Sequence, residues 1–178
     1  MRFREAAIPA SPHAEPIRTP RLDLLPLRVE HAEEMAAVLS DPALHTFIGG
    51  APLDPAALRA RYDRLTAGSP DPAVSWCNWV LRLREAPAPL TGTVQATLTD
   101  RATTAEIAWV IGTPWQGRGL ASEAARGLVD RLRTRGVRTV IAHIHPDHHA
   151  SAAVAAAAGL TPTGVERDGE VRWRRQLR

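Results

Sequence analysis

The sequence contains no lysine, so all 22 of its basic side chains are arginines. Together with 19 acidic residues they give a formal net charge of only +3, although the sequence pI is about 10.3. Arginines such as Arg59 and Arg64 are interleaved with acidic and apolar residues, and only the tail "RWRRQLR" is densely basic. Nucleic-acid binders concentrate their cations in one patch, so we expect no nucleic-acid partner; a DNA- or RNA-binding module that uses this tail is the lesser alternative.

The sequence also has little cysteine and no long hydrophobic run. A single cysteine, Cys77, excludes an internal disulfide and leaves too few thiols for a structural zinc site, which favours a reducing compartment. The longest apolar run, "AAVAAAAGL" from Ala152, is shorter than the roughly 20 residues that span a bilayer. The first residues, "MRFREAAIPA", lack the apolar core of a secretory signal. We therefore expect a cytoplasmic protein with no membrane partner.

The chain has the length and apolar content of one domain. It has 178 residues, of which 44% are hydrophobic and 23% charged, enough to bury one core. Pro9, Pro12 and Pro16 with scattered small residues predict a flexible N-terminal arm over residues 1–18. The prediction for residues 19–178 is a single domain.

Hydrophobic periodicity predicts an alternation of strands and helices. Residues 21–27, "RLDLLPL", predict a strand with contacts on both faces, and helices are expected over 29–41 and 54–65, the second capped by Asp54. Three strands joined as hairpins follow: "SWCNWVLRL", "GTVQATLT" and "AEIAWVIG". A helix over 117–135, a strand over 138–144, a helix over 147–158 and two final strands complete the chain. This order predicts an α/β (α+β) fold with a mixed sheet.

Two glycines, Gly117 and Gly119, stand at the entrance of the helix expected over 117–135. Thr113 with Pro114 would suffice as an ordinary cap, but would leave each glycine costing about 1 kcal/mol relative to alanine. A loop that wraps its free N–H groups around a diphosphate uses both glycines, and Arg118 adds a cation. The absence of lysine excludes a Walker loop. A dinucleotide fingerprint fails because Ser122 occupies the third glycine position and the preceding strands are expected to be antiparallel.

These residues carry a family resemblance. The segment "QGRGLA" at 116–121 fits Q/R-x-x-G-x-G/A, and residues 19–173 resemble the GNAT superfamily of acetyl-CoA-dependent N-acetyltransferases. The likeness is strongest to the branch of ribosomal-protein N-terminal acetyltransferases, in which "TPRLDLLPLR", this motif and a later "P-x-N-x-A-S" segment recur in order. The resemblance implies a mixed, mostly antiparallel sheet flanked by helices and splayed between its fourth and fifth strands, where the pantetheine of acetyl-CoA lies.

The resemblance also implies a set of cofactor-binding residues, although the strand ending at Ile111 reads equally as core if the loop is ignored. The usual asparagine of the third segment is a histidine here, so its contact to CoA is either replaced by imidazole or lost. The implied residues are Trp109, Val110 and Ile111 for the pantetheine, Gln116, Gly117, Arg118, Gly119, Leu120, Ala121 and Ser122 for the pyrophosphate, and His148 in place of the asparagine.

Acetyl transfer to an amine requires removal of a proton. An alkyl ammonium with a pKa near 10.4 is deprotonated at pH 7 at a cost of roughly 4.6 kcal/mol, an α-amino group near pKa 8 at about 1.4. The resemblance makes Glu106 the base, directly or through water, and Ser151 the donor to the CoA thiolate. An exposed strand-face carboxylate and an early-helix serine are the structural alternatives, and His145 is a further candidate base.

Other motifs admit more than one interpretation. The histidines of "HIHPDHH" have spacing that permits a metal site, but Asp147 reads as the cap of the next helix and acetyl transfer needs no metal, so none is expected. Trp76, Trp79 and Tyr62 could line an acceptor pocket, although large aromatics at such spacing are more often core. An acetyl-enzyme on Cys77 is disfavoured because no base lies near it in sequence.

Together these features predict an enzyme that moves the acetyl group of acetyl-CoA to a primary amine by direct attack in a ternary complex. The alternative is a CoA-binding regulatory or interaction domain without catalysis. The acceptor is expected to be a small molecule or a peptide, and the protein a monomer or a homodimer.

Overall fold

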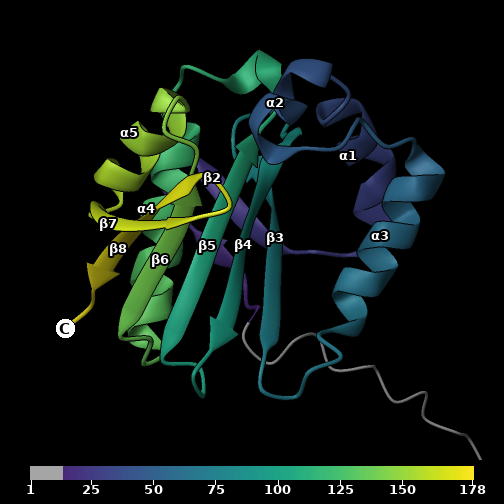
Figure 1. The fold of residues 1–178 in the computed structure, drawn as a ribbon. Helices are drawn as coiled ribbons and strands as arrows, with labels where there is room; N and C mark the ends of the chain where they lie inside the picture. Colours follow the sequence, from purple (N-terminus) through teal and green to yellow (C-terminus); the bar gives the residue numbers. More distant parts are fainter. Residues whose placement is uncertain (1–13) are drawn as a thin grey trace, which may run out of the picture.

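The computed structural model describes residues 14–178 of the chain (Figure 1). Of the arm predicted over residues 1–18, residues 1–13 lie outside the described part. Within it, β1 (Ile17–Arg18) pairs antiparallel with β2 (Leu22–Pro26), and Ile17 is only 7% exposed. The prediction was therefore wrong for the last residues of the arm, because one buried isoleucine anchors them to the sheet.

The sheet has eight strands in the order β1-β2-β3-β4-β5-β6-β8-β7. Among residues 14–178 only β5 and β6 pair in parallel, and every other neighbouring pair is antiparallel, which confirms the mixed, mostly antiparallel sheet. The remaining strands are β3 (Ser75–Leu83), β4 (Leu90–Thr99), β5 (Thr104–Ile111), β6 (Thr139–Ile144), β7 (Thr161–Arg167) and β8 (Glu170–Gln176).

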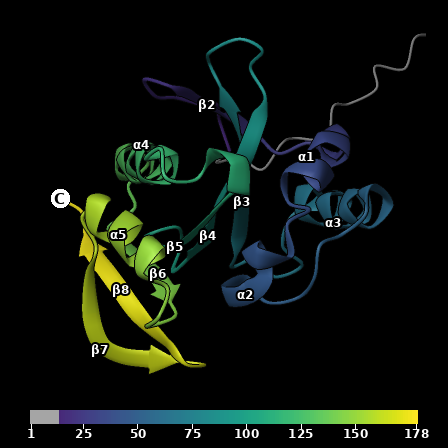
Figure 2. The same ribbon diagram turned by 90° about the horizontal axis from the view of Figure 1, so that it is seen from above.

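Helices cover both faces of this sheet, with α4 and α5 on one side and α1, α2 and α3 on the other (Figure 2). The helices predicted over 29–41 and 54–65 are confirmed, and Asp54 caps the second by accepting from the backbone N–H of Ala57 at 2.7 Å. No helix among residues 14–178 is long and apolar enough to cross a membrane. The helical segments are η1 (Val29–His31), α1 (Ala32–Val38), η2 (Pro42–Leu44), α2 (His45–Ile48), α3 (Pro55–Ala67), η3 (Thr113–Trp115), α4 (Leu120–Thr134) and α5 (His149–Ala157).

Two apolar clusters, one on each face, hold the layers together. The larger joins α4 and α5 to the sheet, and the smaller packs α1 and α3 against β3 and β4. Strand β2 serves both, since Leu22 and Leu24 are buried in the first cluster and Leu25 packs against the second. The prediction of a strand with contacts on both faces is confirmed.

The sheet opens between β5 and β6. The two strands pair only where Thr104, Ala105 and Glu106 face β6, and both continue past that point. Without the short β1, they are the fourth and fifth strands, so the predicted splay is confirmed. The backbone N–H of Gly112 donates to the Thr91 carbonyl at 2.8 Å. Antiparallel pairing alternates, so the backbone groups of Trp109 and Ile111 face the opening, and those of Val110 face β4.

Candidate active site

The loop before α4 is built around two glycines in the left-handed region. Gly117 has φ 73° and Gly119 has φ 75°, and a Cβ at Gly117 would meet no other atom within 4 Å. The glycines are therefore needed for backbone conformation. Gly119 is the N-cap of α4 and makes no side-chain cap bond. The helix therefore begins at Leu120, three residues later than the predicted start at residue 117.

The loop leaves its backbone donors unpaired. Within the described residues, no protein group accepts a hydrogen bond from the N–H groups of residues 117–122. The suggestion that Thr113 caps this helix was wrong, because Thr113 belongs to η3 and its Oγ1 donates to Asp41 Oδ2 at 2.6 Å. Free donors at a helix N-terminus, where the dipole is positive, suit an anion.

A clamp formed by Arg21 and Glu123 fixes the loop from outside. Glu123 Oε1 accepts from Thr19 Oγ1 at 2.6 Å and from the Arg21 backbone N–H at 2.7 Å, and its Oε2 accepts from Arg21 Nε at 2.7 Å. Arg21 Nη1 donates to the Arg118 carbonyl at 2.9 Å. Burial opposes ionisation of Glu123, but these hydrogen bonds and the Arg21 charge outweigh it and lower its pKa. The clamp was not predicted from the sequence. Its only signal in the sequence was that "TPRL", at residues 19–22, recurs together with the glycine motif in the family branch that the chain resembles.

The other motif residues take distinct positions. The Gln116 side chain donates to the Ile111 carbonyl at 3.0 Å, which ties the loop to the end of β5. Leu120 is buried in the core, whereas Arg118 is exposed. Ala121 and Ser122 are half-buried in the first turn of α4. Because the N–H groups of a first helical turn point out of the helix end, both residues direct their backbone N–H groups toward the loop.

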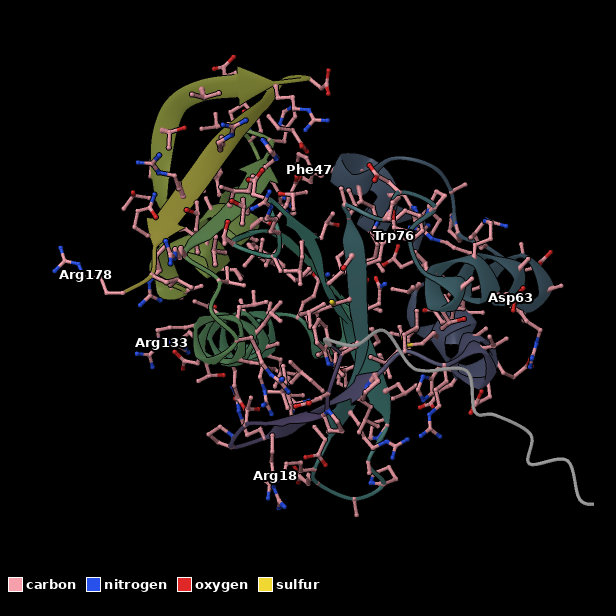
Figure 3. All side chains as sticks on the ribbon, turned by 90° about the horizontal axis from the view of Figure 1, so that it is seen from below. Arg18, Phe47, Asp63, Trp76, Arg133 and Arg178 are labelled. Atoms are coloured by element: carbon pink, nitrogen blue, oxygen red, sulfur yellow. The ribbon has the colours of Figure 1, made fainter. Side chains whose placement is uncertain are left out.

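A cavity of about 540 Å³ lies on the sheet face covered by α2 and α3, beside the opening. Its wall brings together six of the predicted site residues but includes neither Ile111 nor residues 116–122. From α2, Phe47 extends toward the β6 side of the molecule and stacks on the His148 ring, with centroids 4.3 Å apart (Figure 3). The predicted residues on the wall are Glu106, Trp109, Val110, His145, His148 and Ser151.

The candidate acid and base residues differ in their hydrogen bonding. Glu106 has a 43% exposed side chain, and its Oε1 lies 2.8 Å from His143 Nδ1. The Nδ1 atom of His145 accepts from the Asp147 backbone N–H at 3.2 Å. Ser151 Oγ lies 3.5 Å from His148 Nε2. Burial, and to a smaller degree His145, lower the pKa of His148, which favours the neutral imidazole.

The histidine segment does not cap α5 as predicted. The N-cap is His148, without a side-chain cap bond, and Asp147 lies one residue too early because it belongs to the turn closed by the His148 N–H and the His145 carbonyl. In the described part of the chain, no group of three or more His, Cys, Asp or Glu side chains is placed to hold a metal ion.

The aromatic residues divide between core and cavity. Trp79 and Tyr62 are 1% and 4% exposed and also line the cavity, so they serve both roles. Burial raises the pKa of Tyr62 to about 12, and within residues 14–178 its hydroxyl has no hydrogen-bond partner. Trp76 lines a separate pocket of about 50 Å³. Cys77 is 1% exposed and is not part of the cavity wall.

The tail arginines do not form one patch. The Arg175 side chain turns inward and donates to the Ala158 carbonyl, Arg172 faces His143, and Arg174 is exposed. The labelled Arg178 and Arg133 side chains both extend outward (Figure 3). The basic residues of "RWRRQLR" are thus distributed over different surroundings.

Comparison with known proteins agrees with this architecture. The sequence model of the acetyltransferase (GNAT) domain matches residues 21–161. Comparison with curated proteins gives no match. A GNAT-family acetyltransferase from Bacillus anthracis superposes with TM-score 0.77 at 18% identity, over 91% of this chain and 98% of its own.

Two further solved structures share the fold. The acetyl transfer enzyme of Salmonella typhimurium that modifies the N-terminal serine of ribosomal protein L7/L12 gives TM-score 0.76 at 17% identity, over 92% of this chain and 100% of its own. RimJ of Mycobacterium smegmatis, in complex with CoA-disulfide, gives TM-score 0.73 at 19% identity, over 91% of this chain and 86% of its own.

Proposed function

Because the chain belongs to the acetyltransferase (GNAT) family and is an acetyl-CoA-dependent N-acetyltransferase, we propose that it acetylates a primary amine by direct attack in a ternary complex. The observation that carries this proposal is the run of N–H groups at residues 117–122 that have no acceptor within the described part of the chain. They lie next to an opened sheet with a carboxylate on its cavity face. Direct attack is further supported by Cys77, which is buried away from the cavity wall.

The residues present fit the co-substrate. The N–H groups of residues 117–122 would hold the pyrophosphate at the positive end of α4, with the exposed Arg118 as a nearby cation. The backbone groups of Trp109 and Ile111 that face the opening would bond the pantetheine, whereas Val110 contributes only its side chain. Acetyl-CoA supplies the acetyl group activated as a thioester.

Glu106 is the best-placed base. Only Oε1 is bonded to His143, and its partly exposed carboxylate lies on the cavity wall, so Oε2 is available to an amine or to its water. His145 suits the role less: its Nδ1 lone pair is engaged by Asp147, so its neutral form carries the proton on Nε2. Ser151, on the same wall, would protonate the leaving thiolate, with His148 beside it.

The cavity wall indicates the kind of acceptor. Glu106 and Glu170 supply carboxylates for an ammonium. The wall near α2 and α3 combines the apolar side chains of Leu44, Phe47 and Leu58 with one cation, Arg61. One similar structure modifies a protein N-terminal serine. We therefore propose a peptide N-terminus or a small amine with an apolar body as the acceptor, and the protein itself as a monomer or homodimer that binds no nucleic acid.

Release of free CoA thiol from acetyl-CoA against a panel of amines tests this proposal. We expect turnover with peptides that have a free N-terminus or with apolar amines. In Glu106→Gln we expect kcat to be about 10²- to 10⁴-fold lower. Glu85→Gln, at an exposed loop position, is the matched control. A protein that binds CoA tightly and is inactive on every amine would instead be the non-catalytic CoA-binding domain.

A further inference from the structure

The carboxylate of Glu106 is held by a histidine from the opposite side of the opening. Glu106 pairs with Ile141 at the last parallel rung, and His143 follows two residues later on the same face of β6. The His143 side chain is 7% exposed, and its Nδ1 lies 2.8 Å from Glu106 Oε1. The contact therefore bridges the two strands just where their backbone pairing ends.

A third residue fixes the state of this imidazole. His143 pairs with Arg172 in the β6·β8 register, and Arg172 Nε donates to His143 Nε2 at 3.4 Å, a long hydrogen bond. A guanidinium can only donate, so Nε2 must be unprotonated and act as the acceptor. The ring proton of neutral His143 then resides on Nδ1 and is donated to Glu106. Because both ring nitrogens are engaged, His143 is not itself free to accept the proton of an amine.

We propose that His143, oriented by Arg172, is a positioning residue for Glu106. The inference rests on the proposed function of Glu106 as the base. The Nδ1–H group holds Oε1, so the carboxylate cannot rotate freely and Oε2 keeps its orientation to the amine or its water. A base that is itself oriented by another group loses less rotational freedom during proton transfer.

In this arrangement Glu106 is the protein group that receives the proton of the amine. The neutral amine nitrogen would form the new bond to the acetyl carbon and release a proton to Glu106 Oε2, directly or through one water. The C–S bond of the thioester would then break, and the sulfur would leave as the thiol of CoA with the proton that Ser151 donates and solvent replaces. His143 keeps its own proton throughout, and Arg172 stays charged. The histidine thus acts only through Glu106.

Kinetics of three variants test the proposal. His143→Leu removes the donor and is expected to lower kcat at least about tenfold, with the KM for acetyl-CoA unchanged. His143→Asn places an amide N–H near the former Nδ1 and is expected to restore most of the lost rate. His149→Leu, at an exposed position outside the cavity wall, is the matched control and should match the parent.

A tautomer measurement separates this inference from the proposed function. In ¹⁵N-histidine NMR of the intact protein, neutral His143 should show a protonated Nδ1 and an unprotonated Nε2, whether or not an acceptor is known. A protonated Nε2, a kcat within twofold of the parent in His143→Leu, or an Asn variant as slow as the Leu variant would each overturn the inference. If the parent acetylates no amine, the proposed function fails and the positioning role falls with it, whereas the NMR result still reports the geometry.

Discussion

At the residue scale, the site depends on backbone conformation more than on side-chain chemistry. Gly117 and Gly119 both occupy the left-handed region, and the donors they expose are main-chain N–H groups. An L-residue with a Cβ is strained there by roughly 1–2 kcal/mol. A surface loop can relieve that strain by leaving the conformation that presents its donors. Substitution should therefore affect ligand binding as well as stability.

Gly117→Ala is expected to raise the Kd for CoA about five- to tenfold, because binding must restore the strained loop. Gly136→Ala is the matched control: Gly136 has φ 86°, an added Cβ would meet nothing within 4 Å, and it follows the far end of α4. Gly136→Ala should lower Tm by roughly 2–4 °C, and Gly117→Ala by less, because its loop relaxes in the unliganded protein. Isothermal calorimetry that gives the two variants equal Kd values would contradict the role of the loop.

The Glu123 carboxylate predicts a pH dependence. Its pKa is lowered in the folded protein, so its contribution to stability is complete above the ordinary value of 4.5 and is lost as pH falls through the folded value. Glu123→Gln should lose about 1–3 kcal/mol at pH 7, because its single amide oxygen cannot replace both Oε1, which accepts from Thr19, and Oε2, which accepts from Arg21 Nε.

Urea unfolding at several pH values measures this effect. The difference between the parent and Glu123→Gln should shrink as the pH falls below the ordinary value of 4.5, because the unfolded parent then binds the proton before the folded parent does. The exposed Glu85→Gln serves as the control and should follow the parent at every pH. A difference that stays constant down to pH 3 would show that charge is not responsible.

At the element scale, the opening between β5 and β6 determines which backbone groups a ligand can reach. The pairing stops at Glu106, and the alternation of the β4·β5 ladder leaves only every second residue of β5 facing the gap. The resemblance assigned the whole segment ending at Ile111 to the pantetheine. The strand register separates these residues, because the backbone N–H and carbonyl of Val110 face β4, whereas those of Trp109 and Ile111 face the opening.

Amide hydrogen exchange followed by NMR can test this assignment. In the free protein, the N–H groups of Trp109 and Ile111 should exchange faster than that of Val110. CoA at ten times its Kd should slow the first two about tenfold and leave Val110 nearly unchanged. Equal protection of all three residues in the free protein would mean that the opening is closed in solution.

At the scale of the whole molecule, the site combines parts that the sheet holds apart. The loop at α4, the opening between β5 and β6, and the cavity beneath α2 and α3 are separate features, and only a long ligand contacts all of them. Asp41, which precedes α2, accepts a hydrogen bond from Thr113, which precedes the glycine loop, so this bond links the cavity side of the sheet to the loop. The hydrogen bonds from Thr113 and from the Ala43 N–H lower the pKa of Asp41.

Thermal unfolding with ligand fragments tests this arrangement. CoA at 100 times its Kd should stabilise the fold by about 2.7 kcal/mol and raise Tm by roughly 5–10 °C. Pantetheine, which lacks the diphosphate, should give a much smaller shift at the same concentration, and ADP an intermediate one. Pantetheine as effective as CoA would place the main binding energy away from the loop.

The sequence by itself determined most of the secondary structure and the position of the glycine loop before α4. Period-two and period-3.6 patterns, together with caps such as Asp54, are local signals that the tertiary structure left intact. The glycines were readable because only a left-handed backbone requires them. The short α2 and the strand at Ile17 gave no such signal, since four-residue and two-residue elements are stabilised by packing and not by their own pattern.

Only the tertiary structure decided how the site residues meet. Glu106, His143 and Arg172 come from three strands, and their order in the chain does not specify which strands become neighbours. The clamp between Arg21 and Glu123 likewise spans residues 102 positions apart. Local sequence preferences act over a few residues, whereas strand register and splay arise from packing of the whole core, and side-chain partners follow from that register.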